Sequence, residues 1–167
     1  LRGLAIAIGC NPWFTSENPY NGGMACIDET CRNLVAVGAR PNAFTDCLNF
    51  GNPEKPERLG EFREAVRGLG EIARELNIPI PSGNVSLYNE APGGLAILPT
   101  PMIAGCGIIE DVRKAVTADM KRTGSCLYLV GETKDEMGAS LFFRKFGGKE
   151  GDVPGVDIAN LKNLMDK

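Results

Sequence analysis

Apolar residues recur along the chain in short runs and in stripes with helical spacing. Residues 1–10 form an apolar run with the composition of a buried strand. From Met24 to Val35 apolar residues lie three and four positions apart, which predicts a helix that ends at Gly38, a residue suited to a left-handed cap. Residues 57–76 carry the clearest helical stripe, opposite a face of Glu and Arg, and its apolar members are Phe62, Val66, Leu69, Ala73 and Leu76.

Strands are predicted between these helices and after the second one. Residues 41–51 predict a strand with Asp46 in its second half, and residues 78–81 predict a short buried strand that leads into a polar loop. Residues 93–112 predict one or two more strands with proline breaks. Residues 11–23, rich in Pro, Asn and Gly, predict a loop without regular structure. This alternation predicts an α/β (α+β) fold with helices on one face of a sheet.

The chain changes character after Asp111. A charged segment follows, which predicts a linker or a surface helix, and then come a buried strand and two helices, at 125–131, 133–148 and 156–167. One strand and two helices cannot bury a core of their own. The sequence therefore predicts two domains, 1–111 and 112–167, of which the second is incomplete. Because the chain opens in a strand without an initiator Met, we expect it to be the middle of a longer protein.

The composition is that of a globular protein, with 43% apolar and 23% charged residues among 167. The net charge of −3, without a long basic run, lacks the electrostatic signature of a nucleic-acid-binding protein, so nucleic acid is excluded as a partner. No apolar run approaches the ~20 residues of a membrane span, and the N-terminus has no signal-peptide pattern. We therefore expect no membrane partner and a cytoplasmic location.

Histidine is absent, and the six cysteines contain no C-x-x-C pair. Together these facts exclude the usual mixed Cys/His zinc site. We expect reduced, mostly buried thiols, with a disulfide between Cys26 and Cys31 as the alternative. Because acid/base catalysis near neutral pH most often uses His, catalysis would have to rely on carboxylates, on a metal, or on groups supplied by another chain or segment.

The polar stretch at residues 81–90, "PSGNVSLYNE", is the best candidate for ligand binding. Gly83 permits a positive φ angle and a close backbone approach to a phosphate. Asn84 offers an amide oxygen of the kind that magnesium accepts, and Ser86 can donate a hydrogen bond to an anionic oxygen. The same residues also suit an ordinary turn that satisfies local backbone groups. Residue chemistry alone slightly favours the turn.

Two further polar clusters have the same ambiguity. Asp46 follows an apolar run, and because ligands of α/β proteins bind beyond the carboxyl ends of strands, it is a candidate metal or nucleotide contact as well as a candidate turn residue. Residues 18–23, "NPYNGG", precede a predicted helix, and the backbone N–H groups of a helix start attract anions. A turn that simply starts the helix explains this motif equally well. Neither standard Gly-rich nucleotide fingerprint occurs in the chain.

Taken together, in their order and spacing, these clusters are more specific. "NPYNGG", "TDCLNFGNPEKPE" and "IPSGNVSLYNE" resemble the second half of phosphoribosylformylglycinamidine synthase (FGAM synthase), the PurL-type large synthetase subunit. The resemblance implies an N-terminal domain like that of aminoimidazole ribonucleotide (AIR) synthetase, with helices packed on a mixed sheet, followed by a truncated C-terminal α/β domain. It also implies an ATP-dependent C–N ligase of purine biosynthesis.

The resemblance further implies the ligands and their contacts. Enzymes of this family use ATP and Mg²⁺ to convert formylglycinamide ribonucleotide (FGAR) to the amidine, with ammonia from a separate glutaminase subunit. Asp46 and Gly83 match positions that contact ATP, Asn84 matches a Mg²⁺ ligand, and Ser86 matches a substrate contact. The ligand loop then outweighs the turn. Three more residues belong to the same motifs without an implied role: Asn49, Asn52 and Glu90.

This chain also departs from the family pattern. The catalytic His and most acidic metal ligands of the family lie in its first half, so the resemblance implies that the first half of the parent is missing and that this chain alone is inactive, with no catalytic residue to name. An alternative is a non-catalytic module that forms a homo-oligomer (dimer) through its sheet or binds a structural nucleotide. Relatives such as selenophosphate synthetase or thiamine monophosphate kinase carry different motifs in place of "LNFGNPEKPE".

Overall fold

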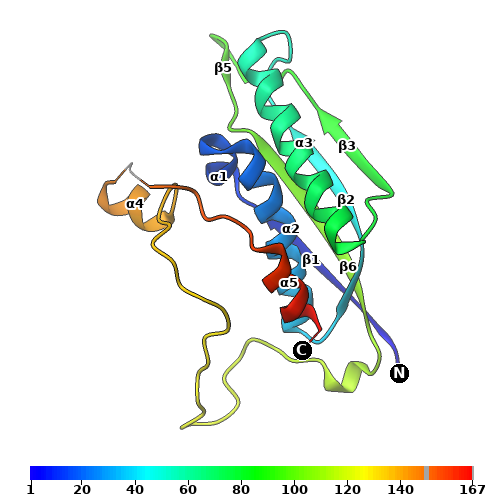
Figure 1. Cartoon of the computed structure of the whole chain (residues 1–167). Coiled ribbons are helices and arrows are strands. Elements are labelled where there is room, and N and C mark those ends of the chain that lie inside the picture. The colour runs from blue at the N-terminus through cyan, green and yellow to red at the C-terminus, as the bar shows by residue number, and fades with distance from the viewer. Residues whose placement is uncertain (149–150, 167) are drawn as a thin grey trace.

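A four-stranded mixed sheet carries two long helices on one of its faces (Figure 1). The structure is a computed structural model that describes residues 1–148 and 151–166. Its elements in chain order are β1 (Gly3–Cys10), α1 (Pro12–Glu17), α2 (Pro19–Ala36), β2 (Arg40–Asn49), α3 (Pro56–Leu76), β3 (Ser82–Ser86), β4 (Glu90–Ala91), β5 (Leu95–Ala96), β6 (Thr100–Ile109), η1 (Val112–Lys114), α4 (Leu141–Phe146) and α5 (Ile158–Met165).

The strand order in the sheet is β1-β6-β2-β3. β6 lies antiparallel to both of its neighbours, whereas β3 runs parallel to β2. A parallel pair needs a crossover connection, and α3 provides it. The short strands β4 and β5 form a separate hairpin between β3 and β6. The predicted α/β (α+β) fold, with helices on one face of a mixed sheet, is therefore confirmed.

The loop predicted at residues 11–23 is wrong, because this stretch forms α1 and the start of α2. Asn11 and Asn18 each act as an N-cap, and their side chains accept hydrogen bonds of 3.1 Å from the backbone N–H groups of Phe14 and Asn21. A proline follows each cap at the first helical position, where its missing N–H costs nothing. The residues that would interrupt a helix interior start two helices here.

The C-terminal end of α2 confirms the predicted cap. Gly38 has a φ of 88°, and its N–H donates to the Val35 carbonyl at 2.8 Å. The N–H of Ala39 reaches back to the Leu34 carbonyl at 3.0 Å. This pair of hydrogen bonds is the Schellman arrangement, which requires a left-handed residue after the helix.

The predicted helix at residues 57–76 is confirmed as α3, but its buried face is rotated from the predicted stripe. Ala65 and Ile72 are fully buried, whereas Val66 is 40% exposed. Phe62 packs edge-on against Phe50, with ring centroids 5.2 Å apart. The stripe therefore located the helix correctly, while its packing against α2 decided which side chains are covered.

Glycines allow α2 and α3 to approach each other closely. A side chain at Gly23 in α2 would collide with the Ala65 carbonyl of α3, and a side chain at Gly68 in α3 would collide with the Tyr20 carbonyl of α2. Each helix thus presents bare backbone to the other at the contact. The two helices consequently form one layer, which covers Phe44 and the rest of the helix-facing side of the sheet.

The strand predicted at residues 78–81 is wrong, because β3 begins only at Ser82, inside the predicted loop. Pro79 and Pro81 have no N–H to donate to a sheet ladder. The carbonyl of Pro79 accepts a hydrogen bond from Phe44 N–H at 2.9 Å, but regular pairing with β2 starts at Ser82. Backbone donors, rather than apolar side chains, set the start of this strand.

The strand predicted at residues 125–131 is also wrong. Residues 115–140 contain no helix or strand, and Leu127 and Tyr128 are 79% and 85% exposed. An apolar sequence forms a strand only when a neighbouring strand takes up its backbone hydrogen bonds. Within the described part of 112–167 there is no such strand, so this segment shows η1 and the helices α4 and α5 but no second sheet.

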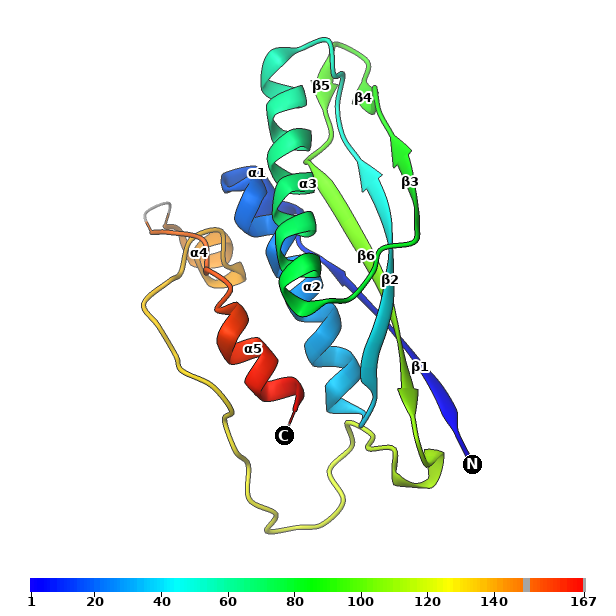
Figure 2. The same ribbon diagram turned by 45° about the vertical axis from the view of Figure 1, so that its right-hand side comes forward.

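The final helix, α5, packs on the side of α2 and α3 that faces away from the sheet (Figure 2). Leu161 is fully buried there, and Lys162 pairs with Glu75 of α3 at 3.3 Å. The predicted amphipathic helix at this position is therefore confirmed. Among the described residues, no helix combines the length and apolar character needed to cross a lipid bilayer.

Residues 1–10 form the predicted strand, β1, but the strand is not buried on both faces. Leu4, Ile6 and Ile8 lie on the sheet face without helices, and Ile6 is 71% exposed. Nothing in the described structure covers this face. All six cysteines are free thiols in this structure, but the prediction that most are buried is wrong, because only Cys26 and Cys31 are. Burial raises the pKa of each of these two thiols to about 12.

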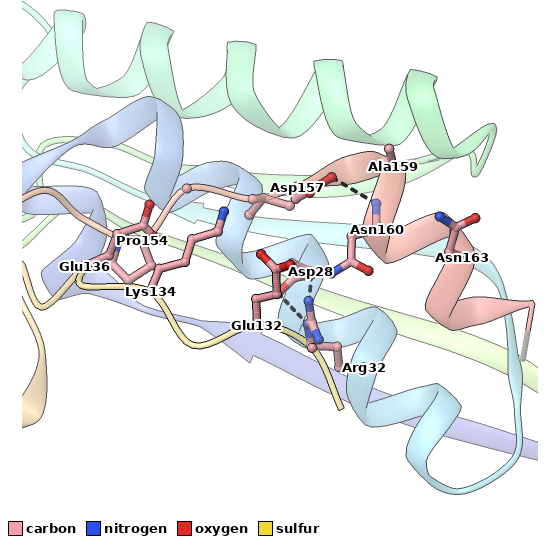
Figure 3. Close-up of a pocket in the computed structure, with 13 residues that line it drawn as sticks. Asp28, Arg32, Glu132, Lys134, Glu136, Pro154, Asp157, Ala159, Asn160 and Asn163 are labelled. Carbon is pink, nitrogen blue, oxygen red and sulfur yellow. Dashed lines mark hydrogen bonds and ion pairs between the residues drawn. The ribbon is translucent and has the colours of Figure 1, made fainter. Parts of the chain in front are cut away.

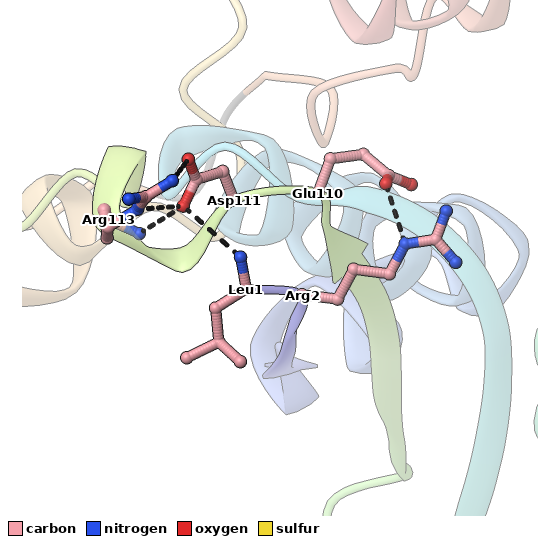
Figure 4. Close-up of polar contacts among 5 residues, drawn as sticks. All are labelled: Leu1, Arg2, Glu110, Asp111 and Arg113. Carbon is pink, nitrogen blue, oxygen red and sulfur yellow. Dashed lines mark hydrogen bonds and ion pairs between the residues drawn. The ribbon is translucent and has the colours of Figure 1, made fainter.

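Ion pairs close the outer end of the β1–β6 ladder (Figure 4). Arg2 pairs with Glu110 at 2.9 Å, and Asp111 lies 2.7 Å from Arg113 and 3.9 Å from the amino group of Leu1. The hydrogen bond from Arg113 holds the pKa of Asp111 below its ordinary value. Apart from Asp111, these groups are largely exposed, and such surface pairs contribute little stability.

We expect Gly68→Ala to destabilise the fold by about 1–3 kcal/mol, because the added methyl group forces α2 and α3 apart. Gly60→Ala in the same helix is the matched control, since a methyl group added at Gly60 would have no neighbouring segment within 4 Å. The control should gain up to ~1 kcal/mol from helix propensity. Urea unfolding of the chain measures both changes, and equal effects at the two positions would contradict the close contact.

Candidate functional site

The four residues singled out from the sequence lie on two neighbouring strands of the sheet. β2 and β3 run parallel, with Asp46 opposite Gly83 and Asn49 opposite Ser86. Asn84 lies between the two β3 positions. The structure therefore brings residues that are almost 40 positions apart in the chain, 46 and 83–86, together along one strand pair. Asn49 and Ser86 are the last residues of the two strands, and ligands of α/β proteins commonly bind beyond such carboxyl ends.

The side chains of these residues nevertheless face two different sides of the sheet. Successive residues of a strand point to opposite faces. Asp46 is two positions from the buried Phe44 and from the buried Leu48, so it shares their face of the sheet, which is the face covered by the helices. Asn84 and Ser86 lie on the opposite face, where Ser82 shares a 3.0 Å hydrogen bond with Thr45. The four residues thus form two pairs rather than one cluster.

Gly83 is required for a reason other than the one expected from the sequence. It does not have the positive φ angle that a glycine permits. Instead, a Cβ at this position would overlap the carboxylate of Asp46. Burial raises the pKa of Asp46 above its ordinary value, and a hydrogen bond from the backbone N–H of Asn84 opposes that rise. Gly83 therefore leaves space for a half-buried carboxylate beside the edge strand.

The surroundings of Asn84 do not complete a magnesium site. Its side chain is exposed, and the nearest carboxylate on these strands, that of Asp46, faces the other side of the sheet. The described residues contain no group of three or more Cys, Asp or Glu side chains arranged to hold a metal. Mg²⁺ in proteins is usually held by one or two carboxylates together with phosphate oxygens and water. Asn84 can therefore contribute one ligand, and the residues of this chain do not fit the whole ion.

Ser86 belongs to a hydrogen-bond network at the end of β3. Its hydroxyl lies 3.1 Å from Oδ1 of Asn89. The Nδ2 group of Asn89 donates to two backbone carbonyls, that of Phe50 at 3.0 Å and that of Ser86 at 2.9 Å. The side chain of Asn89 therefore ties the end of β3 to the end of β2, and it fixes the position of Ser86.

The segment after Ser86 is held against the start of α3. Lys55 pairs with Glu90 at 2.7 Å and also reaches the carbonyl of Gly94 in the β4–β5 turn at 3.4 Å. The hydrogen bond from Lys55 holds the pKa of Glu90 below its ordinary value. Tyr88 has a φ of 59°, an unusual conformation for an aromatic residue, and its hydroxyl donates to Glu54 at 3.3 Å. These contacts hold the segment that follows Ser86 against the start of α3.

Sequence reasoning did not single out Asn89 or Lys55. The spacing of Ser86 and Asn89, three residues apart in a polar loop, is the signal that could have indicated a local hydrogen-bonded turn. Lys55 gives no such local signal, because its partner Glu90 is 35 residues away in the chain. Only the β2–β3 pairing brings the two together.

A hollow of about 580 Å³ opens elsewhere in the molecule, between α2, α5 and the irregular segment at residues 131–136 (Figure 3). None of the four predicted site residues lines it. Its charged lining residues are Asp28, Glu132, Glu136 and Asp157 against Arg32 and Lys134. An excess of carboxylates repels the phosphates of a nucleotide, so the strand pair β2–β3 remains the candidate site.

Comparisons with known proteins show the family to which the chain belongs. The family model described as AIR synthase related protein, N-terminal domain, matches residues 2–109. The PurL subunit of phosphoribosylformylglycinamidine synthase from Methanothrix thermoacetophila is 47% identical over 163 residues, which are 92% of this chain and 21% of that protein. The PurL subunit from a Bradyrhizobium strain is 45% identical over 166 residues, 99% of this chain and 22% of that protein. The chain thus spans about a fifth of the length of the curated relatives it matches.

Solved structures of PurL proteins are also similar to this chain. Thermotoga maritima PurL complexed with ATP superposes with a TM-score of 0.59 at 28% identity, over 65% of this chain and 18% of that one. The same protein complexed with FGAR gives 0.57 at 29% identity, over 65% and 17%. The PurLQS structure from T. maritima gives 0.60 at 28% identity, over 70% and 19%. The chain therefore belongs to the family of AIR synthase related proteins and carries the N-terminal domain of that family.

Proposed function

We propose that this chain is one segment of a phosphoribosylformylglycinamidine synthase, an ATP- and Mg²⁺-dependent ligase that converts FGAR to the amidine with ammonia from a glutaminase subunit. The observation that carries the proposal is the register of β2 and β3, which sets Asp46 beside Gly83 and places Ser86 at the strand end. These are the positions at which the sequence resembles the ligand contacts of the family. A cytoplasmic location belongs to the same proposal.

Each of the four residues has its own role in this proposal. Asp46 and Gly83 contact ATP, Asn84 supplies one oxygen to Mg²⁺, and Ser86 contacts FGAR. Because the two pairs face opposite sides of the sheet, ligands that use both must meet across β3, which is an edge strand. The solved PurL complexes with ATP and with FGAR support the two ligands, and the PurLQS structure supports an assembly with further subunits.

The described residues provide binding groups rather than a complete catalytic set. Amide activation by ATP depends mainly on positioning and on neutralising the phosphate charge. This chain offers a carboxylate, an amide and a hydroxyl for that purpose, but no His and only one ligand for Mg²⁺. We therefore assign no catalytic residue to this chain. In this proposal the first half of the parent protein lies opposite these binding groups and completes the site. Residues 1–111 and 112–167 are the two domains of the segment in this proposal.

A second candidate function is pairing. Leu4, Ile6 and Ile8 leave an apolar stripe on the sheet face that the helices do not cover. Cys106 and Ile108 of β6 continue the stripe. Exposed apolar patches of this kind mark interaction surfaces. A homodimer of this chain through the open sheet face is the function that this stripe favours.

Substitutions in the complete protein should separate the two proposed ligands. Asp46→Ala should raise the KM for ATP about tenfold, as expected for the loss of a hydrogen bond to a charged group, and should leave the KM for FGAR within about twofold. Ser86→Ala should do the reverse. Asp135→Ala, which removes an exposed carboxylate in the irregular segment before α4, is the control. Steady-state kinetics give both constants, and an unchanged KM for ATP in Asp46→Ala would remove Asp46 from the site.

The 167-residue chain alone should show no turnover, because it carries only one wall of the proposed site. The assay supplies ATP, Mg²⁺, FGAR and ammonium and measures the release of ADP. Adding a chain that contains the first half of a relative is the positive control. Robust turnover by the isolated chain would contradict the division of the site between two halves.

The open sheet face should mediate self-association. Ile6→Lys places a charge in the apolar stripe and should convert a dimer of the isolated chain to a monomer. Val66→Lys introduces the same charge on the exposed side of α3 and should leave the dimer intact. Light scattering over a concentration series distinguishes the two. A wild-type chain that stays monomeric throughout the series would exclude this form of pairing.

A further inference from the structure

We propose that Asn89 is a positioning residue that turns the hydroxyl of Ser86 into a hydrogen-bond acceptor, so that Ser86 recognises an N–H or O–H group of the substrate and not its phosphate. The inference deepens the proposed function and rests on it, because it assigns the partner chemistry of Ser86 within that site. No role for Asn89 follows from the sequence resemblance.

The orientation of the Asn89 amide is fixed by its surroundings. One end of the amide lies 3.0 Å from the carbonyl oxygen of Phe50 and 2.9 Å from that of Ser86. Carbonyl oxygens can only accept hydrogen bonds, so the group between them must be the NH₂, with one hydrogen for each. The other end, which lies 3.1 Å from Oγ of Ser86, is therefore the amide oxygen.

The hydroxyl of Ser86 has one hydrogen to donate. An amide oxygen can only accept, so this hydrogen must point to Asn89. The two lone pairs of Ser86 Oγ are then the groups left for a ligand. Ser86 can accept a hydrogen bond from an amide N–H or from a sugar hydroxyl, whereas a deprotonated phosphate oxygen has no hydrogen to give. This reverses the expectation from the sequence that Ser86 donates to an anionic oxygen.

The backbone holds Asn89 in place independently of any ligand. Its N–H donates to the Phe50 carbonyl at 3.2 Å, and the N–H of Tyr88 donates to the Gly51 carbonyl at 3.1 Å. The left-handed conformation of Tyr88, φ 59°, turns the chain so that the Asn89 side chain returns to β3. The Lys55–Glu90 pair anchors the residue that follows. Asn89 is thus preorganised, which is what a positioning residue requires.

FGAR has the groups that this arrangement would recognise. Its formylglycinamide part carries amide N–H groups, and its ribose carries hydroxyls, while its phosphate only accepts at neutral pH. The geometry therefore directs Ser86 towards the amide or the ribose of the substrate. Phosphate recognition falls to other groups of the site.

The test is a double-mutant cycle in the complete protein, with the KM for FGAR as the readout. Ser86→Ala and Asn89→Ala should each raise this KM about five- to tenfold, as expected for one hydrogen bond, with the KM for ATP unchanged. Because Asn89 acts through the Ser86 hydroxyl, the double variant should be no worse than Ser86→Ala. Asn163→Ala, an exposed Asn on α5, is the matched control and should behave as wild type.

The cycle separates positioning from a merely structural role. Effects of the two single variants that multiply in the double variant, or an unchanged KM in Asn89→Ala, would overturn the proposal. A wild-type protein that does not turn over FGAR would instead overturn the proposed function. A Ser86→Ala variant with a wild-type KM for FGAR would remove Ser86 from the substrate site and would therefore also overturn the role of Asn89.

A second measurement does not depend on the folding of Asn89→Ala. Two competitive inhibitors are compared in wild type and Ser86→Ala: the nucleoside of FGAR, which lacks the phosphate, and inorganic phosphate. Loss of an acceptor should weaken inhibition by the nucleoside about fivefold or more and leave inhibition by phosphate unchanged. The opposite result, with weaker inhibition by phosphate alone, would show that Ser86 donates and would overturn the inference.

Discussion

The parallel pairing of β2 with β3 is the interaction on which the candidate site depends. It sets Asp46 against Gly83, and it lets Asn89 reach back from the end of β3 to the Phe50 carbonyl after β2. A parallel pair cannot be closed by a tight turn, so its geometry rests on the crossover helix α3. The position of α3 depends in turn on the glycines at its contact with α2. A packing constraint in the helix layer thus fixes the geometry of a polar site on the sheet.

The two faces of the sheet have different physical characters. The face below α2 and α3 is a packed apolar core that admits one half-buried carboxylate, Asp46, at its margin. The other face is uncovered in the described structure, apolar along β1 and polar along β3. The apolar stripe and the polar strand lie towards opposite edges of this face, because β1 and β3 are the two outer strands of the sheet. The proposed pairing therefore uses the apolar part of this face, whereas the proposed ligand site uses its polar part and also, through Asp46, the helix-covered face.

Much of the fold could be predicted from local signals. Helical spacing located α2, α3 and α5, and Gly38 marked the end of α2. The same signals failed where Pro and Asn have two meanings, because these residues start helices as readily as they form loops. They also failed at residues 78–81 and 125–131, where apolar composition suggested strands. Whether such a segment forms a strand depends on the N–H groups and on the neighbour that pair with it, and neither is visible in a local pattern.

By itself the sequence determined the element types with strong periodicity, the motifs, and through them the family resemblance. The residues of the candidate site, Asp46, Gly83, Asn84 and Ser86, were also named without coordinates. Only the tertiary structure decided on which face each residue lies, why Gly83 lacks a side chain, and which group accepts the hydrogen of the Ser86 hydroxyl. These are consequences of strand register and of contacts between segments distant in the chain, and a linear pattern carries neither.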